Sequence, residues 1–389
     1  MQQNKAPLIL MVSVTIVSIF AQLILTNIVH VDNPSFINVL DGKLLVSTFN
    51  NWSGNIVEIE YDRTSNNFKQ KSIKGSKMIL WPNEITITTG NRSALVGSGF
   101  TPIHRRYGAI WEIQNGKAER ITNVKLGWFY HRALEFDVNG DGILDIVSCR
   151  TYIPIFGGKV LSKLVYFDGL MNMFGSYHEQ EIADGCDVNF IIEDLDKDGK
   201  FEILYAGLFS KSLSILTSST GRFDDPNNIK TIVISNTIGS VFDLIWTDLN
   251  NDGQSELLVS NHQDKQNGKV MIYVPNRVGN LNEWTWEQKN ILVNIPVRIK
   301  GKFQASPGNA IVLHEKNEQG HPYIAVSGDG SMDAYLLRPL DNSYQYSPYA
   351  FTNCTSTVGE IRQVVLDEVR FVVVPCHDKN ELRFFKFEK

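Results

Sequence analysis

The sequence predicts an all-β fold built from repeated small sheets, and two features of the chain lead to this prediction. A nine-residue phrase occurs three times, as DVNGDGILD at 137–145, DLDKDGKFE at 194–202 and DLNNDGQSE at 248–256. Apolar, aromatic and β-branched residues flank each phrase with a period close to two, which is typical of strands. Each phrase is therefore expected to be the loop of a β-hairpin.

The residue types in the phrase indicate a calcium-binding loop. Oxygen-bearing side chains occupy positions 1, 3, 5 and 9 of each copy, and glycine occupies position 6. Calcium binds six to eight oxygen ligands, and glycine permits the sharp turn that folds successive oxygens inward. We therefore expect about three structural Ca²⁺ ions, with the residue at position 7 contributing its backbone carbonyl. The expected ligands are Asp137, Asn139, Asp141, Ile143 and Asp145; Asp194, Asp196, Asp198, Lys200 and Glu202; and Asp248, Asn250, Asp252, Gln254 and Glu256.

Two other interpretations of the phrase fit the residues less well. An EF-hand loop has the same opening, but it needs a Glu at position 12 and a helix on each side. The twelfth positions here are Ser148, Tyr205 and Val259, and the flanking segments are strand-like, which excludes the EF-hand. Surface turns rich in Asp, Asn and Gly would bind no metal. Agreement at five positions in three copies argues against that second alternative.

These phrases resemble the FG-GAP or VCBS repeat, the calcium-loop hairpin of integrin α-subunit propellers and of many extracellular proteins. The clear motif covers about 60 residues, and a weaker periodicity covers about 300. The resemblance implies a β-propeller used in adhesion or recognition. Two copies end in Glu202 and Glu256 instead of the usual Asp, so the loop that ends in Asp145 is expected to bind calcium most tightly.

The spacing of the phrases predicts the number of sheets. They begin at residues 137, 194 and 248, which are 57 and then 54 residues apart, and a period in this range indicates propeller blades or solenoid units. Each interval has room for four short strands, as in a propeller blade. Extending the spacing in both directions gives a seven-bladed propeller at 28–389, with six or eight blades as alternatives. The last unit, 351–389, lacks one strand, which the segment near Ile28–Val31 is expected to supply.

The N-terminal segment indicates export. Residues 8–25 are almost wholly apolar and follow Lys5, as in a secretory signal peptide or a single-pass signal anchor. We assign 1–27 to this segment and favour a cleaved signal peptide, with Ala21 as the best candidate for the cleavage site. Either form would place the propeller outside the cell or in a lumen. The net charge of −5 and the absence of a Lys/Arg-rich stretch argue against nucleic-acid binding.

Four cysteines and three glycosylation sequons agree with an oxidising compartment. Cys354 and Cys376 bracket one expected hairpin, so we expect them to pair and leave Cys149 to pair with Cys186. Four buried thiols are the alternative. The expected N-glycosylation sites are Asn51, Asn91 and Asn353.

The expected topology also predicts a ligand-binding face. The calcium hairpins join the first and second strands at one face, so the other loops gather at the opposite face, where function often resides. These loops are rich in aromatic, His and Arg side chains, which would suit a sugar or a peptide. Packing between blades is the structural alternative for each residue. The candidates are His104, Arg105, Arg106, Trp128, Tyr130, His131, Arg132, Arg150, Tyr152, His262 and His377.

No catalytic motif is found in the sequence: there is no G-x-S-x-G, no H-E-x-x-H, no phosphate-binding glycine loop and no zinc-ligand spacing. The sequence therefore predicts a secreted or membrane-anchored calcium-binding propeller that recognises a glycan or an extracellular protein. The alternative is a polysaccharide lyase, because some propellers with similar repeats are rhamnogalacturonan lyases. A lyase would need a base for the C5 proton on the same face. A scaffold without a small ligand is the third interpretation.

Overall fold

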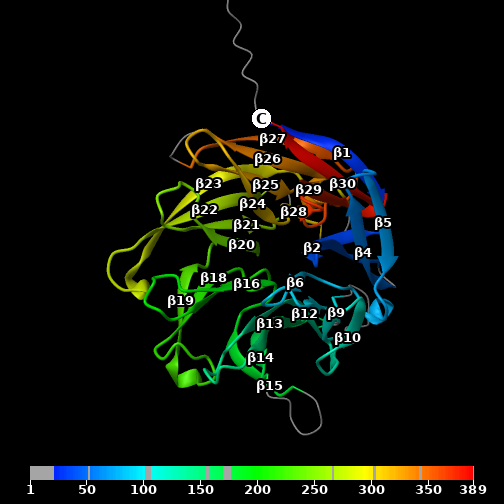
Figure 1. Cartoon of the computed structure of the whole chain (residues 1–389). Helices are drawn as coiled ribbons and strands as arrows, with labels where there is room; N and C mark the ends of the chain where they lie inside the picture. Colours follow the sequence, from blue (N-terminus) through cyan, green and yellow to red (C-terminus); the bar gives the residue numbers. More distant parts are fainter. Residues whose placement is uncertain are drawn as a thin grey trace, which may run out of the picture.

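The computed structural model describes residues 22–50, 53–100, 107–154, 157–169, 177–264, 267–300, 304–340 and 344–388. Within these ranges, seven four-stranded antiparallel sheets surround a central axis (Figure 1). The first strand of each blade contacts the first strands of both neighbouring blades, which closes a ring at the centre. The predicted all-β seven-bladed propeller is confirmed. None of the described helices is long and apolar enough to cross a membrane.

Strands are numbered along the chain, and the strand nearest the axis is given first for each blade. Blade one consists of β2 (Pro34–Leu40), β3 (Lys43–Phe49), β4 (Gly54–Asp62) and β5 (Asn67–Ser72), and blade two of β6 (Ile85–Ile87), β7 (Ala94–Gly97), β9 (Ile110–Gln114) and β10 (Lys117–Arg120). Blade three consists of β12 (Trp128–Phe136), β13 (Asp145–Tyr152), β14 (Leu161–Phe167) and β15 (Glu179–Asp184), and blade four of β16 (Asn189–Glu193), β17 (Glu202–Ala206), β18 (Leu213–Ser218) and β19 (Ile229–Ser235).

Blade five consists of β20 (Val241–Thr247), β21 (Glu256–Asn261), β22 (Gly268–Asn276) and β23 (Thr285–Ile295), and blade six of β24 (Ala310–Lys316), β25 (Pro322–Ser327), β26 (Asp333–Pro339) and β27 (Tyr346–Asn353). Blade seven consists of β28 (Arg362–Leu366), β29 (Val369–Cys376), β30 (Glu381–Glu388) and β1 (Gln22–His30). A short pair, β8 (Tyr107–Gly108) and β11 (Lys125–Leu126), accompanies blade two. The described helices are five single 3₁₀ turns: η1 (Ser76–Met78), η2 (Pro226–Asn228), η3 (Leu281–Glu283), η4 (Asp329–Ser331) and η5 (His377–Lys379).

The N-terminal strand closes the ring, as the sequence predicted. β1 pairs antiparallel with β30, from Gln22 opposite Glu388 to His30 opposite Glu381, and forms the outer edge of blade seven. The strand begins earlier than the segment expected near Ile28–Val31. Its first residues belong to the apolar segment 8–25, of which 8–21 lies outside the described residues.

Alternating apolar side chains fill the spaces between neighbouring blades, because successive residues of a strand point to opposite faces of the sheet. Leu204 and Ile215 of blade four pack with Leu244 and Met271 of blade five in one cluster. The other blades are joined by similar clusters, including one that unites blade one with blade seven. Each blade is therefore stabilised mainly by its neighbours.

Both expected disulfides are confirmed. Cys149 pairs with Cys186, and Cys354 pairs with Cys376, with Cα–Cα distances of 5.4 and 5.2 Å. The first joins blade three to the segment that leads into blade four, and the second joins blades six and seven. Disulfides of this kind indicate folding in an oxidising compartment.

Asp187, beside Cys186, is a fully buried carboxylate that organises a loop. Its oxygens accept the N–H groups of Leu208, Phe209 and Ser210. Burial nevertheless raises the pKa of Asp187 from the ordinary 3.8 to about 7. In the folded chain this group therefore takes up a proton in a pH range in which the unfolded chain does not.

The raised pKa of Asp187 predicts the sign of a pH effect. The protonated carboxyl stabilises the fold in acid, and this contribution is lost as the pH rises through about 7. Asp187→Asn lacks the titrating group, so its free energy of unfolding should increase relative to wild type from about pH 4 to about pH 8. Urea unfolding at several pH values measures the difference. A difference that does not change with pH would contradict the assignment.

Candidate functional site

The three acidic loops join the first and second strands of blades three, four and five, and strands flank each of them. Their backbones wind in the same way around the first Asp. The Asp137 carboxylate accepts the N–H of Gly140 and of Gly142, and Asp248 accepts the equivalent pair from Asn251 and Gly253. The glycine at position 6 has φ of 83°, 88° and 83° in the three loops, a conformation that favours glycine.

The loops differ at position 9. Both carboxylate oxygens of Asp145 accept backbone N–H groups, from Val138 and Gly169, at 2.9 and 2.7 Å. Glu256 accepts the N–H of Leu249 and also bonds to the Tyr344 hydroxyl. In these two loops the last acidic side chain is therefore already occupied within the protein.

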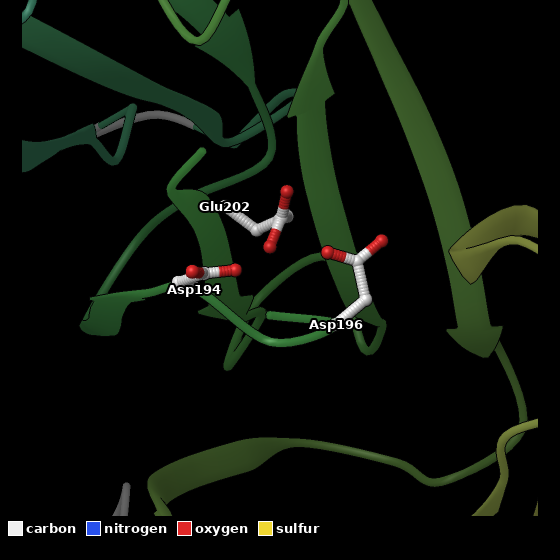
Figure 2. Close-up of side chains that lie close together, drawn as sticks. All are labelled: Asp194, Asp196 and Glu202. Carbon is white, nitrogen blue, oxygen red and sulfur yellow. The ribbon is translucent and has the colours of Figure 1, made fainter. Parts of the chain in front are cut away.

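The second loop is more open to a cation. Glu202 accepts the Leu195 N–H with Oε2. Carboxylate oxygens of Asp194, Asp196 and Glu202 lie within 4.8 Å of one another and converge in front of the hairpin (Figure 2). Oδ1 of Asp194 is buried and has no hydrogen-bond partner among the described residues.

The electrostatics of the second loop also fit a bound cation. Burial, with the nearby charges of Asp196, Asp198 and Asp194, raises the pKa of Glu202 to about 7. Burial and the charges of Asp198 and Asp194 raise the pKa of Asp196 as well. A calcium ion would offset both the repulsion and the buried, unpaired oxygen of Asp194. Asp194, Asp196, Asp198, Glu202 and the Lys200 carbonyl are the groups that could hold it.

A second group of polar side chains lies on the axis of the propeller. There, residues near the start of the first strands enclose a cavity of about 150 Å³. The acidic loops follow the other end of these strands, so this axial cavity lies toward the opposite face. All seven blades contribute to its lining, which includes Ser35, Phe36, Phe49, Glu84, His131, Arg132, Asn189, Phe242, Asp243, Asn309, Asp329 and Glu360.

Irregular pairing in the first strands directs polar side chains to the axis. The register between the first and second strands shifts between Tyr130 and Ala133 in blade three, and between Val241 and Asp243 in blade five. A β-bulge interrupts the strict alternation of side chains. This explains how the adjacent residues His131 and Arg132 both line the axial cavity.

Ion pairs fix part of the cavity wall. The Arg132 guanidinium donates from Nε and Nη2 to the Glu84 carboxylate, at 2.6–3.0 Å, and from Nη1 to the Phe190 carbonyl at 2.9 Å. Burial alone would raise the pKa of Glu84, but the Arg132 charge holds it below its usual value. Arg362 forms a similar pair with Glu360 in blade seven. Arg132 thus links blades two, three and four at the axis.

Four aromatic rings, Phe36, Phe49, Trp81 and Phe100, form a track that leads away from the cavity. The centroid distances between successive rings are 6.4, 4.3 and 6.0 Å, and each ring is half-buried. Trp81 has φ of 51°, which is rare for a bulky side chain. Such strained residues cluster at functional sites, so the track is a candidate binding surface beside the cavity.

Residues 194–259, which span the second and third acidic loops, match the FG-GAP-like repeat family. This segment is an FG-GAP-like repeat. No curated protein sequence matches the chain.

Several solved structures resemble this repeat protein in fold. A putative oxidoreductase (glucose dehydrogenase) of Thermus thermophilus is 14% identical with a TM-score of 0.46, and the match covers 81% of this chain and 98% of the other. An α-L-arabinofuranosidase of Fusarium graminearum is 9% identical (TM-score 0.46; 80% and 93%). An aldose sugar dehydrogenase of Streptomyces coelicolor is 11% identical (TM-score 0.43; 95% and 99%). At these values the likeness concerns the fold alone.

The structure brings together four of the ligand-face candidates. His131 and Arg132 line the axial cavity. His262 lies beside it, with its ring 5.1 Å from Phe242 and Nδ1 3.7 Å from the Asp329 carboxylate. His377 Nδ1 lies 3.1 Å from the Ser35 hydroxyl, within hydrogen-bonding distance.

The remaining described candidates lie together in blade three, away from the cavity lining. Tyr130 is fully buried in a hydrophobic cluster, and Arg150, 3% exposed, forms ion pairs with Glu179 and Glu181. The Trp128 ring centroid lies 4.5 Å from the Arg150 guanidinium carbon and 5.7 Å from the Tyr152 ring centroid. Packing between strands, the structural alternative, accounts for these contacts. His104, Arg105, Arg106 and the sequon residue Asn51 lie outside the described residues, whereas Asn91 and Asn353 are exposed.

Several residues of the cavity and the track were not predicted from the sequence, among them Glu84, Asn189, Phe242, Asp243 and Trp81. Most of them lie close to the start of a first strand, at similar places in different blades. Aligning the blades on their first strands, rather than on the acidic loops, would have placed these side chains around one axis.

Proposed function

We propose that this FG-GAP-like repeat protein is an exported calcium-binding propeller that recognises a carbohydrate at the axial cavity, with calcium serving only to hold the fold. One observation carries this proposal: a small cavity lined by both polar and aromatic side chains adjoins a track of half-buried aromatic rings, Phe36, Phe49, Trp81 and Phe100. Sugars present hydroxyl groups at their edges and C–H groups on their faces, so they match polar walls next to aromatic surfaces.

The size of the cavity favours one sugar residue over a broad protein interface. A volume of about 150 Å³ is enough for a benzene-sized group, so it would admit part of one sugar ring. A stable protein–protein interface would instead bury about 800 Å² on each partner. The aromatic track would then contact the next residue of the sugar chain. An extracellular protein ligand is the outcome that a failed glycan test would favour.

Calcium is placed on the other side of the molecule in this proposal. All side-chain ligands of each ion would come from one hairpin, so the coordination sphere is filled locally and no ligand position is reserved for a substrate. The hairpin joins the first strand to the second, which places the ion where it can hold the inner strands together.

The N-terminal sequence and the disulfides support the proposed export. Residues 8–21, the part of the apolar segment that precedes β1, number 14, fewer than the roughly 20 that a spanning helix needs. We therefore propose a signal peptide that ends before Gln22. The mass of the secreted protein should match a mature N-terminus close to Gln22. Recovery of the full-length chain in the membrane fraction would contradict this.

A polysaccharide lyase at the same face has weaker support. Such an enzyme needs a cation to neutralise the uronate, but the Arg132 guanidinium is bound to Glu84 and Phe190. The carboxylates of Asp243 and Asp329 would also repel a uronate in the cavity. Ultraviolet absorbance of an unsaturated product, released from pectin fragments, would reverse this preference.

A glycan array tests the proposed function, and Trp81→Ala tests the site. The purified protein in calcium buffer should bind a defined set of glycans, and loss of the Trp81 ring should weaken that binding about tenfold. Trp286→Ala is the matched control, because Trp286 belongs to a separate aromatic cluster in blade five. Equal binding by both variants would contradict the proposed site, and no binding to any glycan would contradict the proposed function.

A further inference from the structure

We infer that the sugar residue held in the axial cavity carries a free, protonated amino group. This inference rests on the proposed function, and it names the ligand class that the cavity would select. Its basis is a surplus of hydrogen-bond acceptors and of negative charge in the cavity wall.

One residue of the cavity wall, Asn189 of blade four, has an acceptor without a partner among the described residues. Asn189 is 4% exposed, and its Nδ2 donates to Oδ1 of Asp243. Its own Oδ1 is buried and has no hydrogen-bond partner among the described residues. A buried acceptor without a donor is costly, so a ligand that supplies an N–H or O–H group would be favoured.

His131 of blade three supplies a second acceptor. Its Nδ1 is also buried and has no hydrogen-bond partner within the described ranges, with Glu84 Oε2 3.9 Å away, while the ring is hydrogen-bonded to the Val188 backbone. The nitrogen that bonds to Val188 is therefore Nε2, and in a neutral ring Nδ1 is then the acceptor. Burial lowers the pKa of His131 to about 4, so the ring is neutral near pH 7. Asn189 and His131 both line the cavity.

The charges around the cavity do not balance. Among the described residues, the wall contains four carboxylates, those of Glu84, Asp243, Asp329 and Glu360. Arg132 neutralises Glu84, and Arg362 neutralises Glu360. Asp329 faces the His262 imidazole at 3.7 Å.

Among the described residues, no guanidinium is bound to Asp243, and its carboxylate is satisfied instead by neutral donors. Its carboxylate accepts the Asn189 amide and the N–H groups of Leu244 and Ala310. Burial raises the pKa of Asp243 to about 7 and that of Asp329 to about 6, which shows that their surroundings disfavour the charged forms. A cation in the cavity would stabilise both carboxylates.

The shape of the site indicates an organic cation instead of a metal ion. Within the described ranges, one group of three acidic side chains has ligand atoms within 4.8 Å of one another. It consists of Asp194, Asp196 and Glu202 and lies on the opposite face. The axial carboxylates come from different blades and are too dispersed to coordinate one ion. Phe36, Phe49 and Phe242 supply aromatic walls, which attract organic cations. An ammonium group has three N–H donors, enough for Asn189, His131 and Asp243.

Isothermal calorimetry with three methyl glycosides in calcium buffer tests the inference on the wild-type chain. The glucosamine glycoside should bind about tenfold or more tightly than those of glucose and N-acetylglucosamine, because hydrogen bonds to a charged group are stronger. Equal or tighter binding of a neutral glycoside would overturn the inference and leave the proposed function standing. Binding of n-butylamine as tight as that of glucosamine would overturn the sugar requirement. No binding of any glycoside, together with a negative glycan array, would overturn both.

Asp243→Asn removes the negative charge at nearly constant shape and should cancel the preference for glucosamine over glucose. Asp187→Asn is the matched control, because Asp187 is equally buried, also has a pKa of about 7 and does not line the cavity. Thermal unfolding shows whether each variant is folded. Should Asp243→Asn fail to fold, Asp329→Asn is the second variant. Retention of the full preference in a folded variant would overturn the inference.

Discussion

Chelation of calcium should lower the Tm of the protein by about 10 °C, because each of three ions that bind only the folded chain would add stability that grows with the logarithm of the calcium concentration relative to its Kd. Differential scanning calorimetry in EDTA and in calcium measures the shift. Calcium should restore the Tm better than magnesium, since the loops offer several carboxylates in a flexible hairpin. No change on chelation would contradict three occupied loops.

Glu202→Gln separates a metal site from a simple acidic turn. Without the ion, Glu202 lies beside Asp194 and Asp196, so neutralising it should raise the Tm in EDTA. In calcium the same change removes a ligand and should lower the Tm. Glu287→Gln, at an exposed position on β23, is the control and should leave both values unchanged. A Glu202→Gln shift of the same sign in both buffers would contradict a calcium site in this loop.

Arg132→Met should destabilise the fold by about 3–5 kcal/mol, because it leaves the Glu84 carboxylate buried without a cation. Urea unfolding gives the free energies of the single and double variants. The double variant Glu84→Gln, Arg132→Met removes both charges and should recover most of the loss. Arg222→Met breaks an exposed pair with Asp224 and should change stability by less than about 1 kcal/mol. A single variant as stable as the control would contradict the structural role of Arg132.

The fold was predictable because local signals repeat along the chain. The acidic phrase identified a hairpin, its period identified a blade, and the incomplete last unit required a strand from the N-terminus. The start of that strand at Gln22 was not predictable, because its first residues continue the apolar run of the N-terminal segment. In these residues, a run of apolar side chains is typical both of a signal segment and of an apolar edge strand.

The candidate site was predictable only in part. Tyr130, His131 and Arg132 are consecutive polar or aromatic residues, yet a bulge buries Tyr130 in a hydrophobic cluster and turns the other two to the axis. The sequence does not show the bulge. Asn189 and Asp243 are hydrogen-bonded to each other in the cavity wall, although they are far apart in the chain. Neither residue could be recognised as part of a site from its own sequence neighbours.

The three acidic loops are candidate calcium sites, and the sequence and the structure favour different ones. The sequence ranked them by the last residue and so favoured the loop that ends in Asp145. In the structure Asp145 is held by two backbone N–H groups, whereas the Asp194–Glu202 loop has a buried carboxylate oxygen free. Which carboxylates remain available depends on backbone contacts that the motif does not encode.

A crystal structure of the protein with its best glycan would test the central claim most directly. The account predicts one sugar ring in the axial cavity, hydrogen-bonded to Asn189 and His131, and the next ring over Trp81. A glycan bound at the acidic loops or along the outer strands, with the axial cavity free of sugar, would contradict it.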